Sequence, residues 1–171
     1  MAAVTLGVVG MTWSSSVSAK GSGTHSAATR RTGASRNSKP SSATMDATVP
    51  IALAAADELA AAGASVEVID LRCLVPLDMA TVLASVARTS RLLIVEENPY
   101  QGGWGGTVAS IVADEGFESL DAPIRRVAAE CVPLPFADAL EDEVIPTTAK
   151  VSAALRRLVR SRPSSQRRSK R

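Results

Sequence analysis

The sequence contains few of the residue types on which many catalytic and metal sites depend. Its 171 residues include one histidine, His25, and only 3% of them are aromatic. Because His25 lies in the N-terminal segment, the rest of the chain offers no histidine to act as a general base or as a metal ligand. The two cysteines, Cys73 and Cys131, show no paired metal-ligand spacing. We therefore expect both to be reduced, buried thiols, and we expect neither a disulfide nor a zinc site.

Acidic residues are absent from both ends of the chain. Residues 1–45 contain five basic side chains and residues 156–171 contain eight, with no aspartate or glutamate in either segment. The intervening region therefore holds six basic and all 17 acidic residues, although the whole chain has a net charge of +2. Because the excess of basic residues is confined to the ends, we expect at most a loose, salt-sensitive attraction to anions, and nucleic acid is a disfavoured partner.

No apolar run is long enough to cross a bilayer, so the sequence predicts no membrane partner. Residues 1–46 are rich in serine, threonine, alanine and glycine, and this segment and the basic tail at 161–171 are predicted to be disordered. A secretory signal is disfavoured, because no lysine or arginine precedes the short apolar stretch Ala2–Trp13. We expect a cytoplasmic location. The alternative is an organelle, since residues 1–45 have the acid-free, arginine- and serine-rich character of a transit peptide.

Strand-like and helix-like patterns alternate between residues 47 and 160. Unbroken apolar runs rich in β-branched residues predict strands of a parallel sheet, and apolar residues spaced by three or four positions predict amphipathic helices. The predicted helices cover residues 50–62, 78–88 and 107–117 and begin again at 147, and the predicted strands cover 65–70, 91–96 and 124–128. This alternation predicts one α/β domain, a three-layer α/β/α sandwich with a mainly parallel sheet.

Ligands and partners of such a sheet usually meet the loops at the carboxyl ends of its strands. These loops are expected at residues 71–77, 97–106 and 129–135. None of them contains a Ser–His–Asp set, a Cys–His pair or clustered metal ligands. We therefore predict no catalytic, cofactor-binding or metal-binding residue in this chain.

A glycine-rich turn, Gly102–Gly106, precedes the helix predicted at 107. Free backbone amides in such a turn can bind an anion. However, the turn lacks the lysine and the serine or threonine of a phosphate-binding loop, and its spacing does not match a dinucleotide-binding fingerprint. We favour close packing of Gly103 against a neighbouring subunit, with Trp104 as an anchor and Tyr100 beside it.

Carboxylates gather at two further places. Glu96 and Glu97 end a predicted strand, where carboxylates are usually solvated. The densest acidic cluster comprises Asp138, Glu141, Asp142 and Glu143. It lies in the proline-containing stretch 133–146, which we predict to run along the surface, and nothing around it indicates the cleft that acid–base chemistry requires. A solvated surface is the default interpretation at both places.

Three segments occur in the order found in a known family. They are VEVIDLRCLVPLD at 66–78, LLIVEENPYQGGWGG at 92–106 and IRRVAAECVPLPFADALED at 124–142. With the helices between and after them, they make residues 47–160 resemble the C-terminal domain of transketolase-like proteins. The resemblance is greatest to the beta subunit of the thiamine-diphosphate-dependent component of 2-oxoacid dehydrogenase complexes, of the pyruvate or branched-chain type.

The resemblance implies a function in assembly. Such a domain helps to assemble a heterotetramer with an alpha subunit and offers a docking surface to the acyltransferase core. Glu96 and Glu97 would then flank a loop at the subunit interface. The acidic cluster, with Asp138, Glu141 and Asp142 as interface candidates, would attract the basic subunit-binding domain of the acyltransferase. Contact between two copies of the chain is a further option. In the family, thiamine diphosphate and magnesium are held by the preceding domain and the alpha subunit, so we expect them in the parent complex and not on this chain alone.

The sequence departs from the family pattern in two ways. The preceding domain, with its cofactor-activating glutamate, has no counterpart, so we do not expect this chain to decarboxylate a 2-oxoacid alone. The family also enters its first helix from a β-branched strand, whereas residues 35–46 here read SRNSKPSSATMD. Because these polar residues cannot bury a strand face, we expect the first strand to be missing or degraded. The abrupt start of the resemblance at Ala47 leads us to expect a truncated or frame-shifted reading of a longer gene.

Two other functions stay open at this point. The chain could be a non-enzymatic binding module whose basic segment at 156–171 contacts nucleic acid or another anion. It could also be the C-terminal domain of a related enzyme, such as a transketolase or a 2-oxoacid:ferredoxin oxidoreductase, because fold alone does not separate these chemistries.

Overall fold

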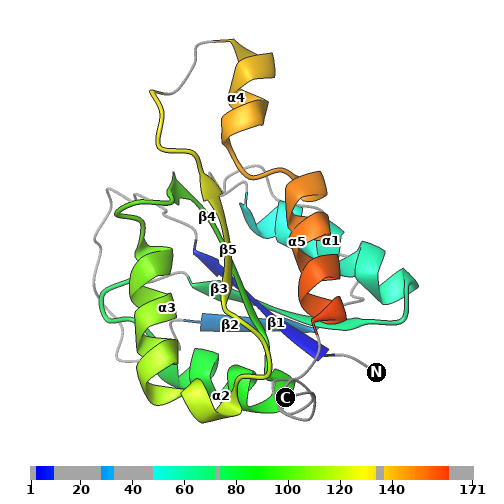
Figure 1. Ribbon diagram of the computed structural model, residues 1–171, viewed down its shortest axis with the longest axis vertical. Coiled ribbons are helices and arrows are strands. Elements are labelled where there is room, and N and C mark those ends of the chain that lie inside the picture. The colour runs from blue at the N-terminus through cyan, green and yellow to red at the C-terminus, as the bar shows by residue number, and fades with distance from the viewer. Residues whose placement is uncertain (1–2, 10–27, 33–47, 72–73, 134–136, 162–171) are drawn as a thin grey trace, which may run out of the picture.

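The computed structural model describes residues 3–9, 28–32, 48–71, 74–133 and 137–161, which form the three-layer α/β/α sandwich predicted from the sequence (Figure 1). The strands are β1 (Ala3–Val9), β2 (Ala28–Thr32), β3 (Ser65–Leu71), β4 (Leu92–Pro99) and β5 (Arg125–Ala129). The helices are α1 (Thr48–Ala61), α2 (Met79–Thr89), α3 (Trp104–Glu115), the short 3₁₀ helix η1 (Phe117–Ser119), α4 (Asp138–Val144) and α5 (Thr148–Arg160). Helices α1 and α5 cover one face of the sheet, and α2 and α3 cover the other.

The five strands lie in the order β2-β3-β1-β4-β5. β1 pairs in parallel with β3 and β4, and β4 pairs in parallel with β5, whereas β2 runs antiparallel to β3 at one edge. Parallel strands need a crossover connection, and α2 and α3 supply it between β3 and β4 and between β4 and β5. The four parallel strands therefore end at the same edge of the sheet, where the loops that follow β3, β4 and β5 meet.

The strand position that we expected to be missing or degraded is occupied by β1. This strand lies between β3 and β4, and its residues Ala3–Val8 pair with Ser65–Asp70. Its sequence, AVTLGVV, is the apolar, partly β-branched run that a central strand requires. The expectation was wrong because it assumed that this strand directly precedes the first helix. The strand instead comes from the start of the chain, and residues 10–47 separate it from α1.

Strand β2 comes from the same N-terminal segment. We predicted residues 1–46 to be disordered, but Ala28–Thr32 pairs with Glu67–Leu71 of β3. The folded region therefore includes two stretches of that segment as well as the domain predicted at 47–160. The other residues before Thr48, like the basic tail at 162–171, lie outside the described residues, so their disorder stays a prediction.

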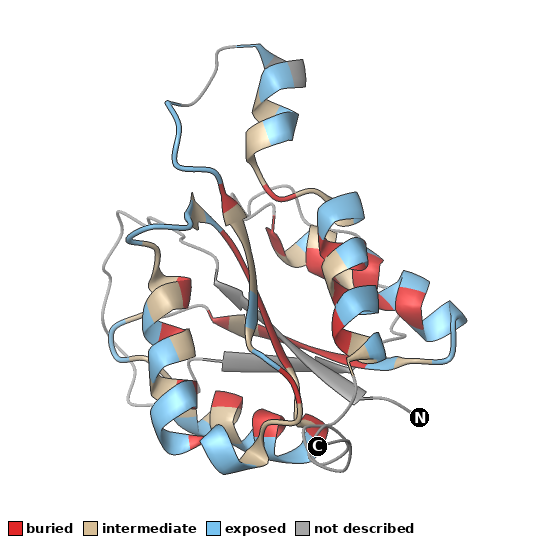
Figure 2. Ribbon diagram, in the orientation of Figure 1, coloured by how far each residue is buried: buried red, intermediate tan, exposed pale blue. Residues whose placement is uncertain are grey.

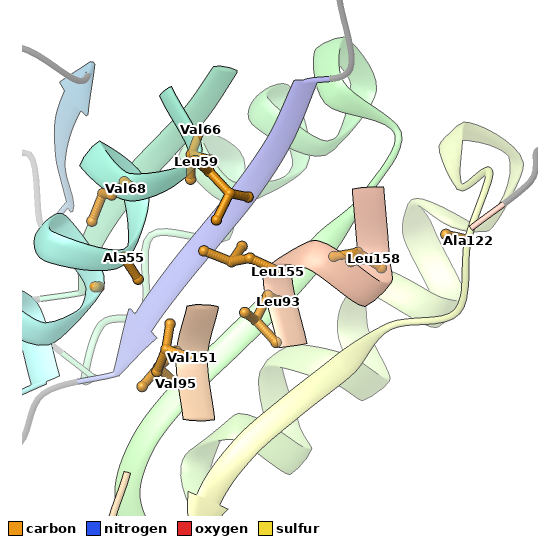
Figure 3. Packing of buried hydrophobic residues seen from close by; sticks show 12 residues of the cluster. Ala55, Leu59, Val66, Val68, Leu93, Val95, Ala122, Val151, Leu155 and Leu158 are labelled. Atoms are coloured by element: carbon orange, nitrogen blue, oxygen red, sulfur yellow. The ribbon is translucent and has the colours of Figure 1, made fainter. Parts of the chain in front are cut away.

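The apolar core consists of two clusters, one on each face of the sheet (Figure 2). The cluster beneath α1 and α5 includes Leu59, Val66, Leu93 and Leu155 (Figure 3). The cluster beneath α2 and α3 includes Ile69, Val86, Ile94 and Val108. Because β4 has helices on both faces, its first four residues are all buried, as its unbroken apolar run predicts. Full burial of each large aliphatic side chain contributes about 1.5–3 kcal/mol.

A buried carboxylate in β3 joins the sheet to α2. Glu67 is 8% exposed and accepts a hydrogen bond from the Ser85 hydroxyl at 2.7 Å. The Nη2 of Arg88 donates to the same carboxylate oxygen at 3.0 Å. These polar partners offset the cost of removing the Glu67 charge from water.

The helix starts predicted at Asp78 and Thr147 are confirmed. The backbone N–H of Thr81 donates to Oδ1 of Asp78 at 3.1 Å, and that of Lys150 donates to the Thr147 hydroxyl at 3.4 Å. Each side chain therefore satisfies one of the amides that a helix N-terminus leaves unpaired.

Three local predictions were wrong. Helix α3 begins at Trp104 and not at Thr107, because its first turn contains glycines that single-residue helix propensity disfavours. The stretch 133–146, predicted as a surface loop, contains α4. Cys131 is exposed and not buried, because it lies two residues beyond the end of β5, whereas Cys73 lies outside the described residues. In the part of the chain that the structure describes, no helix has the length and hydropathy to cross a membrane.

Candidate subunit interface at the carboxyl edge of the sheet

The carboxyl end of β4 carries Glu96 into the interior of the domain. Its side chain has 0% exposure, although carboxylates at strand ends are usually solvated. Because β1 and β5 flank β4 on either side and α3 covers it, the strand is still enclosed at this position. The next residue, Glu97, is exposed. One of the two adjacent glutamates is therefore buried and the other is exposed. The sequence did not indicate this difference, because both residues stand at the end of the same strand.

Three donors satisfy the Glu96 carboxylate. The Nε of Arg126 donates to Oε1 at 3.0 Å, and Nη2 of the same guanidinium also donates to Oε1. The backbone N–H of Gly105 donates to Oε2 at 2.8 Å. Arg126 comes from β5, next to Ile94 of β4 in the sheet register, and Gly105 lies in the first turn of α3. A single buried carboxylate thus joins β4, β5 and the positive end of the α3 dipole.

Two glycines make room for this carboxylate. A Cβ on Gly105 would lie 2.7 Å from Cδ of Glu96 and 2.9 Å from Cγ2 of Ile94. A Cβ on Gly103 would lie 2.8 Å from the carbonyl oxygen of Pro99 and would also meet the Glu96 carboxylate. Real Cβ atoms do not approach other atoms this closely, so no side chain fits at either position. Close packing around Glu96 therefore explains, within the domain itself, why Gly103 and Gly105 of this turn are glycines.

Tyr100 connects this buried pair to the surface. The Arg126 guanidinium carbon lies 4.2 Å from the centroid of the Tyr100 ring, a cation–π contact. The backbone N–H of Tyr100 donates to the carbonyl of Ala129 at 2.9 Å, which ties the loop after β4 to the end of β5. Tyr100 is nevertheless 55% exposed. The contacts with Arg126 and Ala129 therefore hold Tyr100 in place, and its exposed part is accessible to a partner.

The other predicted interface residues of this loop divide between core and surface. Trp104 is partly buried and packs against the apolar cluster beneath α2 and α3. Gly103 and Trp104 thus have structural roles within the domain, and their contact with another subunit stays a prediction. Glu97 and Tyr100 are the exposed members of the predicted set in this loop.

The acidic cluster lies away from this loop, on α4, which projects beyond the body of the domain (Figure 1). Asp142 is exposed and Glu141 is half-buried, whereas the side chain of Asp138 lies outside the description. The Lys150 ammonium holds the end of α4, donating to the carbonyl oxygens of Asp142 at 3.2 Å and Ile145 at 2.8 Å, and also to that of Glu143. A cation at a helix C-terminus is the favourable arrangement.

The sequence interpretation missed Arg126 and Lys150. The sequence did contain one indication of the role of Arg126. A charged residue within a largely apolar strand needs a buried partner of opposite charge. The sequence could not say which of many carboxylates that partner is. Lys150 had no distinguishing signal, because a lysine in the first turn of a helix usually faces solvent.

The residues of this site hold the loop after β4 and the start of α3 in place. Within the described ranges, no group of three or more His, Cys, Asp or Glu side chains could hold a metal ion. Glu96 already accepts from Arg126 and Gly105 and is closed to solvent. These residues therefore do not fit thiamine diphosphate and its magnesium, and we derive no catalytic step from them.

The comparisons with known proteins agree with the resemblance seen in the sequence. The family described as transketolase, C-terminal domain, matches residues 44–151. The pyruvate dehydrogenase E1 component subunit beta of Rickettsia felis is 46% identical over 110 residues, which cover 64% of this chain and 34% of that relative. The acetoin:2,6-dichlorophenolindophenol oxidoreductase subunit beta of Bacillus subtilis is 42% identical over 103 residues, which cover 60% of this chain and 30% of that relative. The chain thus spans about a third of the length of these relatives.

A solved structure with a similar fold is described as "Split gene transketolase, inactive beta4 tetramer". It covers 94% of this chain and 39% of its own chain with a TM-score of 0.61. Its sequence identity is 20%, so the similarity concerns the fold alone.

Proposed function

Because this chain belongs to the transketolase C-terminal domain family, we propose that it is the assembly and partner-docking domain of a 2-oxoacid dehydrogenase decarboxylating component, of beta-subunit type. The names of the Rickettsia felis and Bacillus subtilis relatives, both beta subunits, support this proposal. On this proposal, its partners are the alpha subunit of the same component and the acyltransferase core. Thiamine diphosphate and magnesium belong to the assembled component.

The observation that carries the proposal is the support beneath Tyr100. The buried Glu96–Arg126 pair and the hydrogen bond to Ala129 hold the loop after β4 in one arrangement, while Tyr100 itself stays exposed. A rigid, exposed aromatic side chain loses little conformational entropy when a partner covers it, and such residues often dominate interface energetics. The loop at the carboxyl edge is therefore the expected contact with the alpha subunit.

Binding to the alpha subunit encoded by the same genome tests this proposal. The full chain should form a complex with it, and Tyr100→Ala should weaken the complex about tenfold or more, as truncation of an anchoring aromatic residue does. The matched control is Phe117→Ala, which removes a similar ring from η1 at a residue that is 72% exposed. The control should change the dissociation constant by less than about twofold. No complex with the unaltered chain, or equal effects of the two substitutions, contradicts the proposal.

The acidic residues of α4 give the second contact, with the acyltransferase. Long-range attraction to a basic domain would speed the encounter more than it adds affinity. The double substitution Glu141→Lys and Asp142→Lys should therefore slow association in low salt by about tenfold. The matched control is the double substitution Asp114→Lys and Glu115→Lys. It changes the net charge by the same amount, at two exposed positions of α3 instead of α4. An association rate that does not distinguish the two variants counts against docking at α4.

The purified chain should not act alone. With thiamine diphosphate, magnesium and pyruvate added, we expect no release of carbon dioxide above the level without protein. Turnover by the isolated chain contradicts an assembly role as its main function.

A further inference from the structure

A groove between β5 and α5 gathers most of the basic side chains of the folded region. Its volume is about 630 Å³. Between residues 48 and 161 the structure describes eight lysine and arginine side chains, and six of them line this groove. They are Arg125, Arg126, Lys150, Arg156, Arg157 and Arg160. No described aspartate or glutamate lines it, although the same region contains 16 acidic residues. The charge of the groove is therefore opposite to that of the domain around it.

Four of these six cations have no carboxylate partner among the described residues, and one of the four, Lys150, donates to the carbonyl oxygens of Asp142, Glu143 and Ile145 instead. Arg126 pairs with Glu96, and Arg156 lies 3.3 Å from Glu58. The guanidinium groups of Arg125, Arg157 and Arg160, by contrast, have no carboxylate partner among the described residues. Like charges one helical turn apart repel each other. An anion that enters the groove would therefore relieve repulsion as well as gain attraction.

The rest of the groove lining is apolar. It consists of Val127 of β5 and of Ala153 and Ala154 of α5. The alanine side chains leave space above them that larger residues would fill. The groove can therefore admit a polypeptide backbone as well as a single ion.

Strand β5 borders this groove and is an edge strand. It stands at the end of the strand order and pairs only with β4 among the described strands. The outer N–H and C=O groups of an edge strand can pair with an extended segment of another chain. Side chains alternate along β5: Val127 packs toward α5, whereas Arg126, although it also borders the groove, directs its guanidinium to Glu96 on the opposite face. A strand added beside β5 would alternate in the same way, so every second side chain would face the groove.

We propose that the β5–α5 groove binds an extended acidic segment of a partner protein. The backbone of this segment pairs with the free edge of β5, and its alternate carboxylates meet Arg125, Arg157 and Arg160. Guanidinium groups suit carboxylates because their fork of donors matches two carboxylate oxygens. A nucleic acid would bind the same cations, but it has no backbone groups that can continue a β-sheet. It would therefore account for the charge of the groove and not for the free edge of β5. The proposal does not depend on the assembly function above.

The first experiment separates strand pairing from simple charge attraction. The probe is a fluorescent, N-acetylated peptide of about eight alternating glutamate and threonine residues, titrated with the full chain. Its counterpart is N-methylated at every residue, which keeps the charge but removes the backbone donors. We expect the unmodified peptide to bind at least about tenfold more tightly, with an affinity that falls as salt rises. Amide hydrogen exchange at residues 125–129 should also slow when it binds.

The second experiment locates the site. Arg157→Gln with Arg160→Gln should weaken peptide binding about tenfold or more, because both lost cations face the groove. Ala80→Glu with Ala87→Glu is the matched control. It makes the same change of net charge at exposed positions of α2, on the opposite face of the sheet. The control should weaken binding by less than about twofold, because the sheet separates these positions from the groove and salt weakens the remaining long-range repulsion.

Three results would overturn the proposal. The first is equal affinity for the two peptides, which would mean that the groove attracts charge without strand pairing. The second is tighter binding of a single-stranded oligonucleotide of matched charge than of the peptide. The third is an equal loss of peptide binding in the arginine variant and in its α2 control.

Discussion

The carboxylate of Glu96 and the guanidinium of Arg126 form an ion pair that is almost closed to solvent, with side chains 0% and 11% exposed. The two residues are 30 positions apart in the sequence and come from neighbouring strands. Because Arg126 also contacts the ring of Tyr100, the pair links the interior of the sheet to its exposed carboxyl edge. A change at Glu96 should therefore affect both the stability of the domain and the order of this loop.

Neutralising Glu96 should destabilise the domain strongly. Glu96→Gln keeps the shape of the side chain but leaves the Arg126 charge buried without its partner, which costs about 3–5 kcal/mol in the free energy of unfolding. Urea denaturation measures this difference. Glu115→Gln, at an exposed position of α3, is the control and should stay within about 0.5 kcal/mol of the unaltered protein. Equal effects of the two substitutions would show that Glu96 is not the buried anchor described above.

Adjacent glycines of α3 should respond in opposite directions to alanine. Gly105→Ala forces a Cβ against Glu96 and Ile94 and should lower the unfolding free energy by about 1–3 kcal/mol. The nearest side-chain atom to a Cβ on Gly106 is Nη1 of Arg126, at an ordinary 3.6 Å. Gly106→Ala should therefore raise stability by about 0.5–1 kcal/mol through better helix propensity. Thermal unfolding of the two variants compares the signs directly, and a shift in the same direction would contradict this packing.

Proline in β1 should disrupt the sheet. Leu6 lies opposite Val68 of β3 and Leu93 of β4, so its strand has a neighbour on both sides. Leu6→Pro removes a backbone donor from this central strand and should cost about 3 kcal/mol or more. Leu6→Ile keeps the donor and suits a strand, so it is the control. If circular dichroism shows the same melting temperature for both variants, the N-terminal residues do not complete the sheet.

Removing the ammonium of Lys150 should loosen α4 without unfolding the domain. Lys150→Met keeps the aliphatic part of the side chain but loses the donor to the carbonyl oxygens of Asp142 and Ile145. Amide exchange in α4 should rise about fivefold, the equivalent of one hydrogen bond. Lys150→Arg keeps a donor and should show a smaller rise. Unchanged exchange in the methionine variant would mean that the acidic helix is positioned by other contacts.

The local predictions that succeeded rest on short-range signals. The apolar run at 92–95 indicates a strand covered on both faces, and the caps at Asp78 and Thr147 act on amides three residues away. The predictions that failed depend on distant contacts. The burial of Glu96 follows from Arg126, and the first turn of α3 forms because its glycines fit around that carboxylate.

The sequence by itself determined the α/β class, most element positions and the family resemblance, because alternating apolar patterns and caps act over a few residues. Only the tertiary structure decided that residues 3–9 complete the centre of the sheet, that Glu96 is buried, and that arginines from β5 and α5 line one groove. The physical reason is the same in each case. Strand pairing, burial and charge clustering depend on residues that are remote in the chain, and no local pattern encodes which of many partners will meet.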